Sequence, residues 1–158
     1  MLYVFMGLFA AAVVALDQFT KALVQSHIAV HLNIPAVPGL FHLTHEHNTG
    51  GAFSLLEGQQ WLFVLVFALL AMLIVWEFAK KRLPFRMLER WCIIAVFAGG
   101  LGNMLDRLRL GYVVDMIEVE FITFPVFNVA DCFITCGCIL LIVSLVFFNR
   151  DFWKDEKK

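Results

Sequence analysis

Long apolar runs separated by short polar segments dominate the chain. Four of these runs are long enough to cross the membrane interior, since about 30 Å of hydrocarbon takes roughly 20 helical residues at 1.5 Å each. They lie at about 2–24, 59–79, 90–110 and 129–149. The pattern predicts an all-α membrane protein built as a four-transmembrane-helix bundle.

Two segments outside these runs alternate apolar and polar residues, which is the period of a half-buried strand. The clearer one covers residues 117–121 and the weaker one residues 41–45. Pro35 and Pro38 exclude a regular helix from the first connection. We therefore expect a small β-rich cap on the helix bundle, with residues 1–158 forming a single integral membrane domain.

Composition and charge narrow the class of protein. Hydrophobic residues make up 61% of the chain and mean hydropathy is +0.84, too apolar for a soluble domain of this size. The net charge is -1, and the basic residues are gathered rather than interleaved with aromatic residues in a stripe. These features exclude nucleic acid as the expected partner.

The basic residues also predict the orientation. They cluster at residues 80–90 and 150–158, and neither Lys nor Arg occurs between 22 and 79 or between 110 and 149. Because cytoplasmic connections retain positive charge, both termini are expected in the cytoplasm and the β-rich cap outside it. The first run has no preceding Lys or Arg and no clear cleavage site, so it is interpreted as a retained span rather than a secretory signal.

This orientation places the intramembrane polar residues in one layer. At 1.5 Å per residue, Asp17 lies roughly 22 Å along the first span and Asp106 roughly 22 Å along the third. Asp131 falls in the first turn of the fourth span, and Asp115 lies in the connection above it. A charge inside lipid costs several kcal/mol unless it is paired or hydrated, so such a layer indicates an active site.

Simpler interpretations of several polar and small residues stay open. Asp17 and Lys21 are four positions apart and could only neutralise each other, with Lys21 reaching toward the interface. Gly99, Gly100 and Gly102 do not have the spacing of a phosphate-binding fingerprint and favour close helix packing instead.

Metal and thiol chemistry are not expected. All histidines lie between residues 27 and 47, where His27 and His31 have helical spacing but lack an HExxH order or a third ligand of defined spacing. All cysteines lie inside predicted spans, which disfavours disulfides. A cysteine nucleophile would need a nearby histidine, although Cys132 beside Asp131 leaves this alternative open. We expect no cofactor.

Two aspartates in a water-poor pocket suit general acid and base hydrolysis. When two carboxyl groups share a site, their repulsion raises the pKa of one, so that the pair holds a single proton. The ionised carboxylate can activate water while the protonated one polarises a carbonyl. Asp115 and Asp131 are separated by a segment containing Pro125, which lets the chain fold one residue over the other.

Five sequence blocks carry a resemblance to a known family. They are DQFTK at 17–21, NTGGAFS at 48–54, GGLGNMLDR at 99–107, VVD at 113–115 and FPVFNVAD at 124–131. Together they resemble the motif blocks of bacterial lipoprotein signal peptidase, also called signal peptidase II. The resemblance covers all four spans in order. The chain departs from the family in the short stretch between the last two blocks, which lacks tryptophan.

The resemblance implies an aspartic endopeptidase of the bacterial plasma membrane. It would cleave the signal peptide from diacylglyceryl-modified prolipoproteins just before the lipid-modified cysteine, with Asp115 and Asp131 as the catalytic dyad that activates water. The expected partners are these precursors and membrane lipids, the expected state is a monomer, and the active site is expected near the outer, periplasmic or extracellular face. Residues that match the family's pocket and substrate-holding positions are Asp17, Lys21, Asn48, Gly50, Asn103, Asp106, Arg107, Asn128 and Ala130.

Two other classes of function are compatible with carboxylates in a membrane. A proton-coupled transporter would be expected to have broken helices at the bilayer midplane and paired internal repeats, and the sequence has neither pattern. A structural subunit without chemistry would tolerate conservative replacement of Asp115 and Asp131.

Overall fold

A computed structural model describes residues 1–51 and 55–153. Residues 52–54 of the NTGGAFS block and the lysines at the C-terminal end lie outside the described residues. The elements are α1 (Leu2–His27), β1 (Ile34–Val37), β2 (Phe41–Asn48), α2 (Gln60–Lys80), α3 (Met87–Leu110), β3 (Val113–Val119) and α4 (Val129–Val143). A π-helical turn, Ser144–Phe148, continues α4, and a 3-10 turn follows at Arg150–Trp153.

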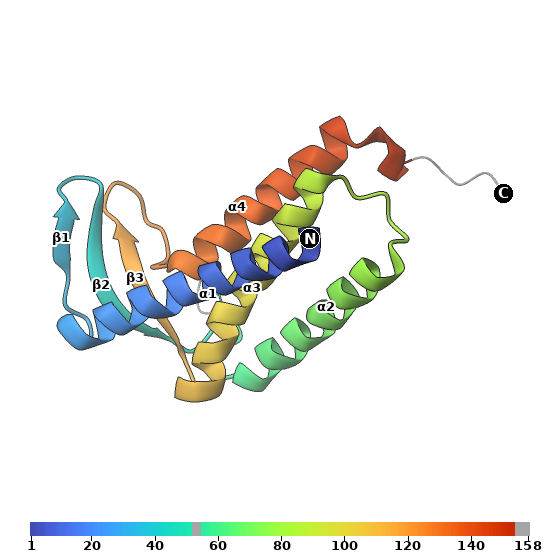
Figure 1. Cartoon of the computed structure of the whole chain (residues 1–158). Coiled ribbons are helices and arrows are strands. Elements are labelled where there is room, and N and C mark those ends of the chain that lie inside the picture. Colours follow the sequence, from blue (N-terminus) through green and yellow to red (C-terminus); the bar gives the residue numbers. More distant parts are fainter. Residues whose placement is uncertain (52–54, 154–158) are drawn as a thin grey trace.

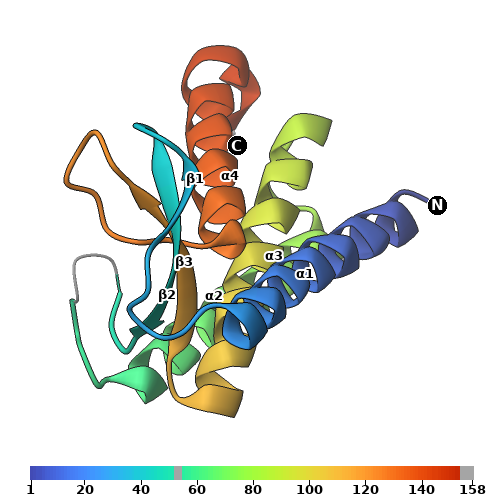
Figure 2. The same ribbon diagram turned by 90° about the vertical axis from the view of Figure 1, so that its left-hand side faces the viewer.

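The four helices confirm the predicted bundle. Each is long and apolar enough to span a membrane, and the last candidate span runs from Val129 to Phe148. The helix α1 ends three residues beyond the first predicted span, and α3 begins three residues before the third predicted span. Figure 1 shows the sheet at one end of the helices, with both chain termini toward the other end. Turned by 90°, the strands lie together on one side of the helices (Figure 2).

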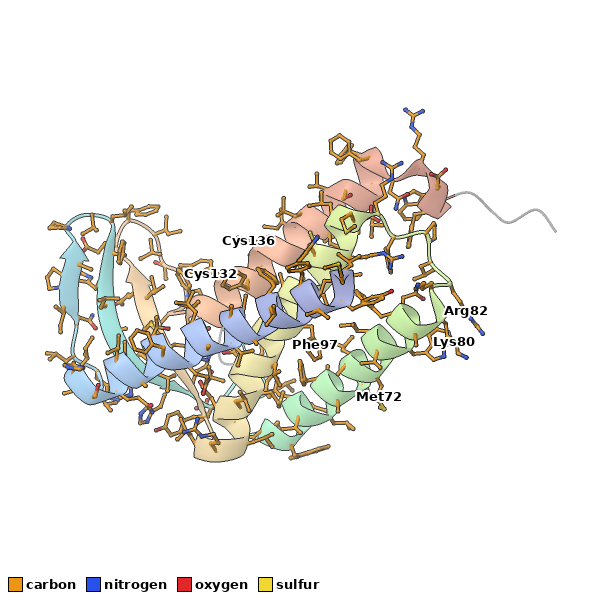
Figure 3. All side chains as sticks on the ribbon, viewed as in Figure 1. Met72, Lys80, Arg82, Phe97, Cys132 and Cys136 are labelled. Carbon is orange, nitrogen blue, oxygen red and sulfur yellow. The ribbon has the colours of Figure 1, made fainter. Side chains whose placement is uncertain are left out.

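Close packing joins α1, α2 and α4 to α3. A Cβ atom at Gly99 of α3 would lie 2.5 Å from the carbonyl oxygen of Ala130 on α4, and one at Gly102 would lie 2.5 Å from Oδ2 of Asp17 on α1. The helix α2 packs on α3 through Phe67, whose ring centroid is 5.7 Å from that of Phe97 (Figure 3). The interpretation of these glycines as contact points is therefore confirmed, because any side chain would hold the helices apart.

The cap is a three-stranded antiparallel sheet in the order β1-β2-β3. The predicted small sheet is confirmed, but the sequence pattern did not predict the edge strand β1, where Pro35 is tolerated because an edge strand needs fewer ladder hydrogen bonds. The strand β3 also starts earlier than the alternating pattern and ends before Phe121. Its first four residues are all buried, so no alternation marks them.

Asp115 is consequently part of strand β3 rather than of a loop above the fourth span, which corrects the sequence-based placement. The helix α3 ends at Leu110, and Gly111, with a φ of 81°, provides the left-handed C-cap that turns the chain into β3. The bridge between Ile117 and Phe127 then brings the returning segment back to the start of α4. This path returns the chain from β3 to the N-terminal end of α4.

Candidate active site

A buried lysine connects α1 to α3. The Lys21 ammonium nitrogen lies 2.9 Å from Oδ2 of Asp17, 2.8 Å from Oδ2 of Asp106 and 2.9 Å from Oδ1 of Asn103. The side chains of Lys21, Asp17 and Asp106 are 2%, 0% and 3% exposed. Lys21 and Asp17 do pair, as the simpler interpretation held, but Lys21 turns into the protein instead of toward an interface.

Side chains accept hydrogen bonds from the backbone N–H groups at the start of α4. The Asn128 side chain accepts a hydrogen bond from the Asp131 backbone N–H at 3.0 Å, and Oδ2 of Asp131 accepts one from the Asn128 backbone N–H at 3.1 Å. Oδ1 of Asp17 accepts the backbone N–H of Ala130 at 3.0 Å. These bonds use donors that a helix start leaves unpaired, and the positive end of the helix dipole favours an anion there.

Asp115 and Asp131 meet through two asparagines. The Asn128 amide donates to Oδ1 of Asp115 at 2.6 Å and to Oδ1 of Asn103 at 3.1 Å. The Asn103 amide in turn donates to Oδ1 of Asp131 at 2.7 Å, and the Asn48 amide donates to Oδ2 of Asp115 at 2.8 Å. Both aspartates line one cavity of about 500 Å³. The strand β3 and the helix α4 thus bring the two carboxyl groups to the same space.

Burial raises the pKa of the Asp115 carboxyl from its ordinary value to about 7. Removal from water is the largest cause, and the charge of Asp131 adds to it. The hydrogen bonds from Asn48 and Asn128 act in the opposite direction because they stabilise the carboxylate. Asp115 therefore exchanges a proton with its surroundings near neutral pH.

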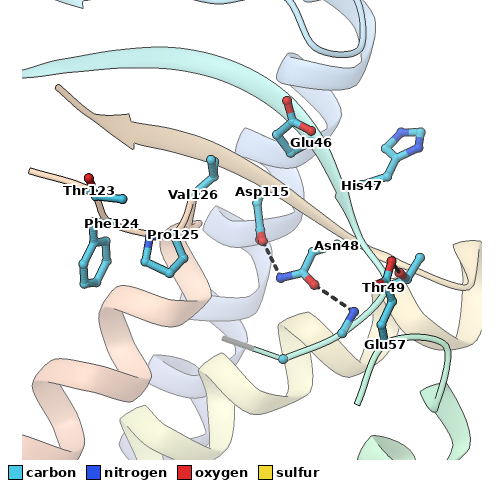
Figure 4. Close-up of a pocket in the computed structure, with 12 residues that line it drawn as sticks. Glu46, His47, Asn48, Thr49, Glu57, Asp115, Thr123, Phe124, Pro125 and Val126 are labelled. Carbon is cyan, nitrogen blue, oxygen red and sulfur yellow. Dashed lines mark hydrogen bonds between the residues drawn. The ribbon is translucent and has the colours of Figure 1, made fainter. Parts of the chain in front are cut away.

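The cavity beside the aspartates has two chambers. The helix-side chamber, of about 500 Å³, is lined by α3, α4 and the 124–127 segment and includes Cys132 and Cys136 of α4 (Figure 3). The sheet-side chamber, of about 510 Å³, is lined by the end of β2, the 49–51 segment and residues 123–126. Figure 4 shows Asp115 facing Asn48 in the sheet-side chamber. Asp115 lines both chambers, so it stands where they meet.

Arg107 fixes the segment that follows β2. Its Nη2 donates to the Gly50 carbonyl oxygen at 2.7 Å, and its guanidinium carbon lies 4.4 Å from the Phe63 ring centroid. The Gly50 N–H donates to Oδ1 of Asn48 at 2.9 Å, which leaves the NH₂ group of Asn48 turned toward Asp115. Arg107 thereby helps to orient a donor to Asp115 without touching it.

The structure brings together the residues that the sequence analysis selected, in two tiers. Those that line a chamber are Asn48, Gly50, Asn103, Arg107, Asp115 and Asp131. Those that support them from behind are Asp17, Lys21, Asp106, Asn128 and Ala130, which have no place among the described residues that line either chamber. Ala130 is fully buried, and its methyl group packs at the α3–α4 contact beside Gly102.

Sequence reasoning missed two contributors. Gln18 donates to Oδ1 of Asp106 at 2.8 Å and to the Gly102 carbonyl oxygen at 3.2 Å, so it completes the partners of Asp106. Its position inside the DQFTK block was an available signal. Phe63, which supports Arg107, lies in an apolar run where nothing distinguishes it from its neighbours.

The histidines and cysteines are distributed among separate contacts. His31, before β1, pairs with Glu46 of β2, and His42 of β2 pairs with Glu120, which follows β3. His47 stacks on Tyr112 with ring centroids 3.8 Å apart. Within residues 1–51 and 55–153, no three His, Cys, Asp or Glu side chains are grouped to hold a metal ion. Cys132 faces the helix-side chamber, where the described lining residues include no histidine to serve as its base.

Fold and site together define a multi-pass membrane protein with paired carboxyl groups in a cavity at the sheet end of its helices. The chain belongs to the signal peptidase II family, whose profile, Signal peptidase (SPase) II, matches residues 9–147. It is therefore an aspartic peptidase of the signal peptidase II type, and the resemblance carried by the five sequence blocks is confirmed.

Individual relatives agree with this family. The lipoprotein signal peptidase of Streptococcus pyogenes serotype M5 (strain Manfredo) is 41% identical over 143 residues, which cover 90% of this chain and 89% of the relative. A bacterial membrane enzyme solved by the in meso method at 2.3 Å resolution superposes with a TM-score of 0.86 at 31% identity, covering 97% of this chain and 93% of that one. A second, solved at 1.9 Å, gives a TM-score of 0.81 at 31% identity over 90% of this chain and 93% of that one.

Proposed function

We propose that this peptidase cleaves the signal peptide from diacylglyceryl-modified prolipoproteins just before the lipid-modified cysteine, using Asp115 and Asp131 as its catalytic dyad. The observation that carries this proposal is the shared environment of the two carboxyl groups. Asn128 donates its amide to Asp115 and its backbone N–H to Asp131, and both aspartates line the same cavity. In the proposal the attacking water lies in this cavity between the two carboxyl groups.

In the proposed reaction Asp115 starts protonated and Asp131 starts ionised. The raised pKa of Asp115 favours one proton on the pair near neutral pH, and the proposal assigns that proton to Asp115. Asp131 takes a proton from water as the water oxygen bonds to the peptide carbonyl carbon, while Asp115 gives its proton to the carbonyl oxygen. The carbon–nitrogen bond then breaks, Asp131 protonates the leaving amine, and the hydroxyl proton returns to Asp115.

The remaining polar residues act by position. Asn48, Asn103 and Asn128 hold the carboxyl groups in the orientation that faces the cavity. The buried Lys21 donates to Oδ1 of Asn103 and so fixes the orientation of the Asn103 side chain. Arg107 donates to the Gly50 carbonyl oxygen and so fixes the segment that orients Asn48. Preorganised donors of this kind avoid reorganisation during the reaction, which is where much of the rate enhancement of enzymes arises.

The membrane arrangement forms part of the same proposal. We infer that residues 1–158 form one integral membrane domain that is surrounded by lipids and active as a monomer. Both termini lie in the cytoplasm. The sheet and the dyad then lie near the outer face, because the basic residues that stay cytoplasmic lie at the other end of the spans. A lipid-modified cysteine anchored at that face would present the preceding peptide bond at the depth of the dyad.

Replacement of each aspartate tests the proposal. Asp115→Asn and Asp131→Asn are expected to remain folded and inserted in liposomes but to lose cleavage of a diacylated precursor by at least 10³-fold, because neither retains an acid–base pair. Asp151→Asn is the matched control, since this side chain is exposed beyond the far end of α4 and should leave cleavage unchanged. Cleavage retained by both dyad variants would refute the assignment.

A further inference from the structure

The two chambers differ in the character of their walls. Helix residues such as Ile134 and the thiols of Cys132 and Cys136 line the helix-side chamber, whereas Glu46, Thr49 and Glu57 line the sheet-side chamber alone. Asp115 lines both chambers and Asp131 lines the helix-side one, so a peptide cut at the dyad can extend from the helix-side chamber into the sheet-side chamber. Figure 4 shows residues that line the sheet-side chamber, among them Glu46, Thr49 and Glu57.

The substrate has the same asymmetry. The half before the scissile bond is an apolar signal segment, and the half after it begins with the lipid-modified cysteine and continues as the polar mature protein. Burying the apolar half against the helix-side wall and leaving the polar half in the sheet-side chamber avoids stranding polar groups in apolar surroundings. The residues after the cysteine therefore pass through the sheet-side chamber.

Charge in this chamber comes from two glutamates. Glu46 of β2 pairs directly across the sheet with Asp115 of β3, so the two side chains share a face of the sheet, and Oε2 of Glu46 lies 2.8 Å from Nδ1 of His31. Glu57 lies at the other wall and accepts a hydrogen bond from the Thr49 hydroxyl at 3.2 Å. Neither Lys nor Arg occurs among the described residues of the wall. Burial lowers the pKa of His47, the remaining titratable base there, which keeps it neutral at pH 7.

We propose that the sheet-side chamber binds the residues that follow the lipid-modified cysteine and that Glu46 and Glu57 favour a cationic side chain there. This inference rests on the proposed function. Cross-strand Cβ atoms lie about 5 Å apart, and an extended peptide advances about 3.3 Å per residue. Glu46 is therefore within reach of the second and third residues after the cysteine, which we assign as the charge-sensitive positions.

A series of precursors tests this assignment. Diacylated precursors carry Lys, Gln or Glu at the second and third positions after the cysteine, and kcat/KM is measured in liposomes for the full chain. We expect the Lys precursor to exceed the Glu precursor by roughly three- to ten-fold, as partly screened charge pairs allow. The ratio should fall toward one in the Glu46→Gln, Glu57→Gln double variant. It should also shrink for the unaltered protein at high salt, where such pairs are screened.

Glu118→Gln is the matched control for the two glutamate variants. Glu118 lies on β3 of the same sheet, bonds Asn33, and lines neither chamber among the described residues. It should keep the full preference for Lys. Equal rates for all three precursors, or a preference that survives in the double variant or disappears in Glu118→Gln, would overturn the inference while leaving the proposed function in place. Failure to cleave even the Gln precursor would overturn both.

Discussion

Asn48 should set the pH range in which the dyad works. Its amide donates to Oδ2 of Asp115 and lowers the pKa of that carboxyl against the stronger effect of burial. The proposed reaction needs one proton on the pair, so kcat/KM should fall as pH rises through about 7, the pKa of Asp115. In Asn48→Ala the carboxylate loses a donor, its protonated form is favoured, and the alkaline limb of the profile should move to higher pH.

The size of the shift follows from the strength of one hydrogen bond. A hydrogen bond to a charged group contributes about 1.5–3 kcal/mol net, and one pKa unit corresponds to about 1.4 kcal/mol. The Asn48→Ala limb should therefore lie about one to two pH units above that of the unaltered protein. Asn48 also accepts the Gly50 N–H, so the rate at the optimum should fall as well, but a loss of rate alone does not displace the limb.

The assay is the pH dependence of kcat/KM for a diacylated fluorogenic lipopeptide in detergent micelles, from pH 5 to 10. Asn33→Ala is the matched control, because Asn33 donates to Glu118 at an exposed part of the sheet and should leave the limb in place. The limb belongs to the coupled pair rather than to Asp115 alone, so both variants are compared with the same two-proton scheme. An unmoved limb in Asn48→Ala, or one displaced to lower pH, would refute this account of the site.

Three further perturbations test other parts of the structure. Lys21→Met should lower the free energy of unfolding by about 3–5 kcal/mol, measured in detergent against Lys80→Met, because it strands two buried carboxylates. Gly99→Ala should lower it by about 1–3 kcal/mol through forced separation of α3 and α4, whereas Gly7→Ala, with open space around its Cβ, should not. N-ethylmaleimide should block cleavage by adding to Cys136 in the helix-side chamber. When activity is normalised to that of each untreated protein, inactivation should be slower for Cys136→Ser than for the unaltered protein.

The helices and the polar layer were predictable from the sequence for a simple physical reason. Lipid offers no hydrogen bonds to the backbone, so an apolar run of about 20 residues has to be helical. The fixed rise per residue then converts position into depth, which is why the sequence places Asp17, Asp106 and Asp131 at one level. In the structure Lys21 pairs with Asp17 and Asp106, and Asn103 connects Lys21 to Asp131.

The strand positions were harder to predict because burial in the cap is uneven. Val113 to Met116 are covered on both faces, and their sequence therefore lacks the alternation that marks residues 117–119. The sequence also could not predict which asparagine NH₂ groups donate to the dyad, because this depends on how each side-chain amide is rotated. Gly50 N–H settles that rotation for Asn48, and a sequence motif gives the residue but not the bond.

A second buried polar cluster shows how α4 is held at its far end. Glu89 of α3 is fully buried and accepts the Ser144 hydroxyl at 2.9 Å and the Asn149 amide at 2.7 Å, both just beyond α4. At the other end, Asp17 binds the Ala130 N–H. Side chains from neighbouring helices thus fix the helix that carries Asp131 at both ends, which opposes sliding along its axis. Because the dyad also requires Asp115 of the sheet, anchoring of α4 at both ends favours a fixed position of Asp131 beside it.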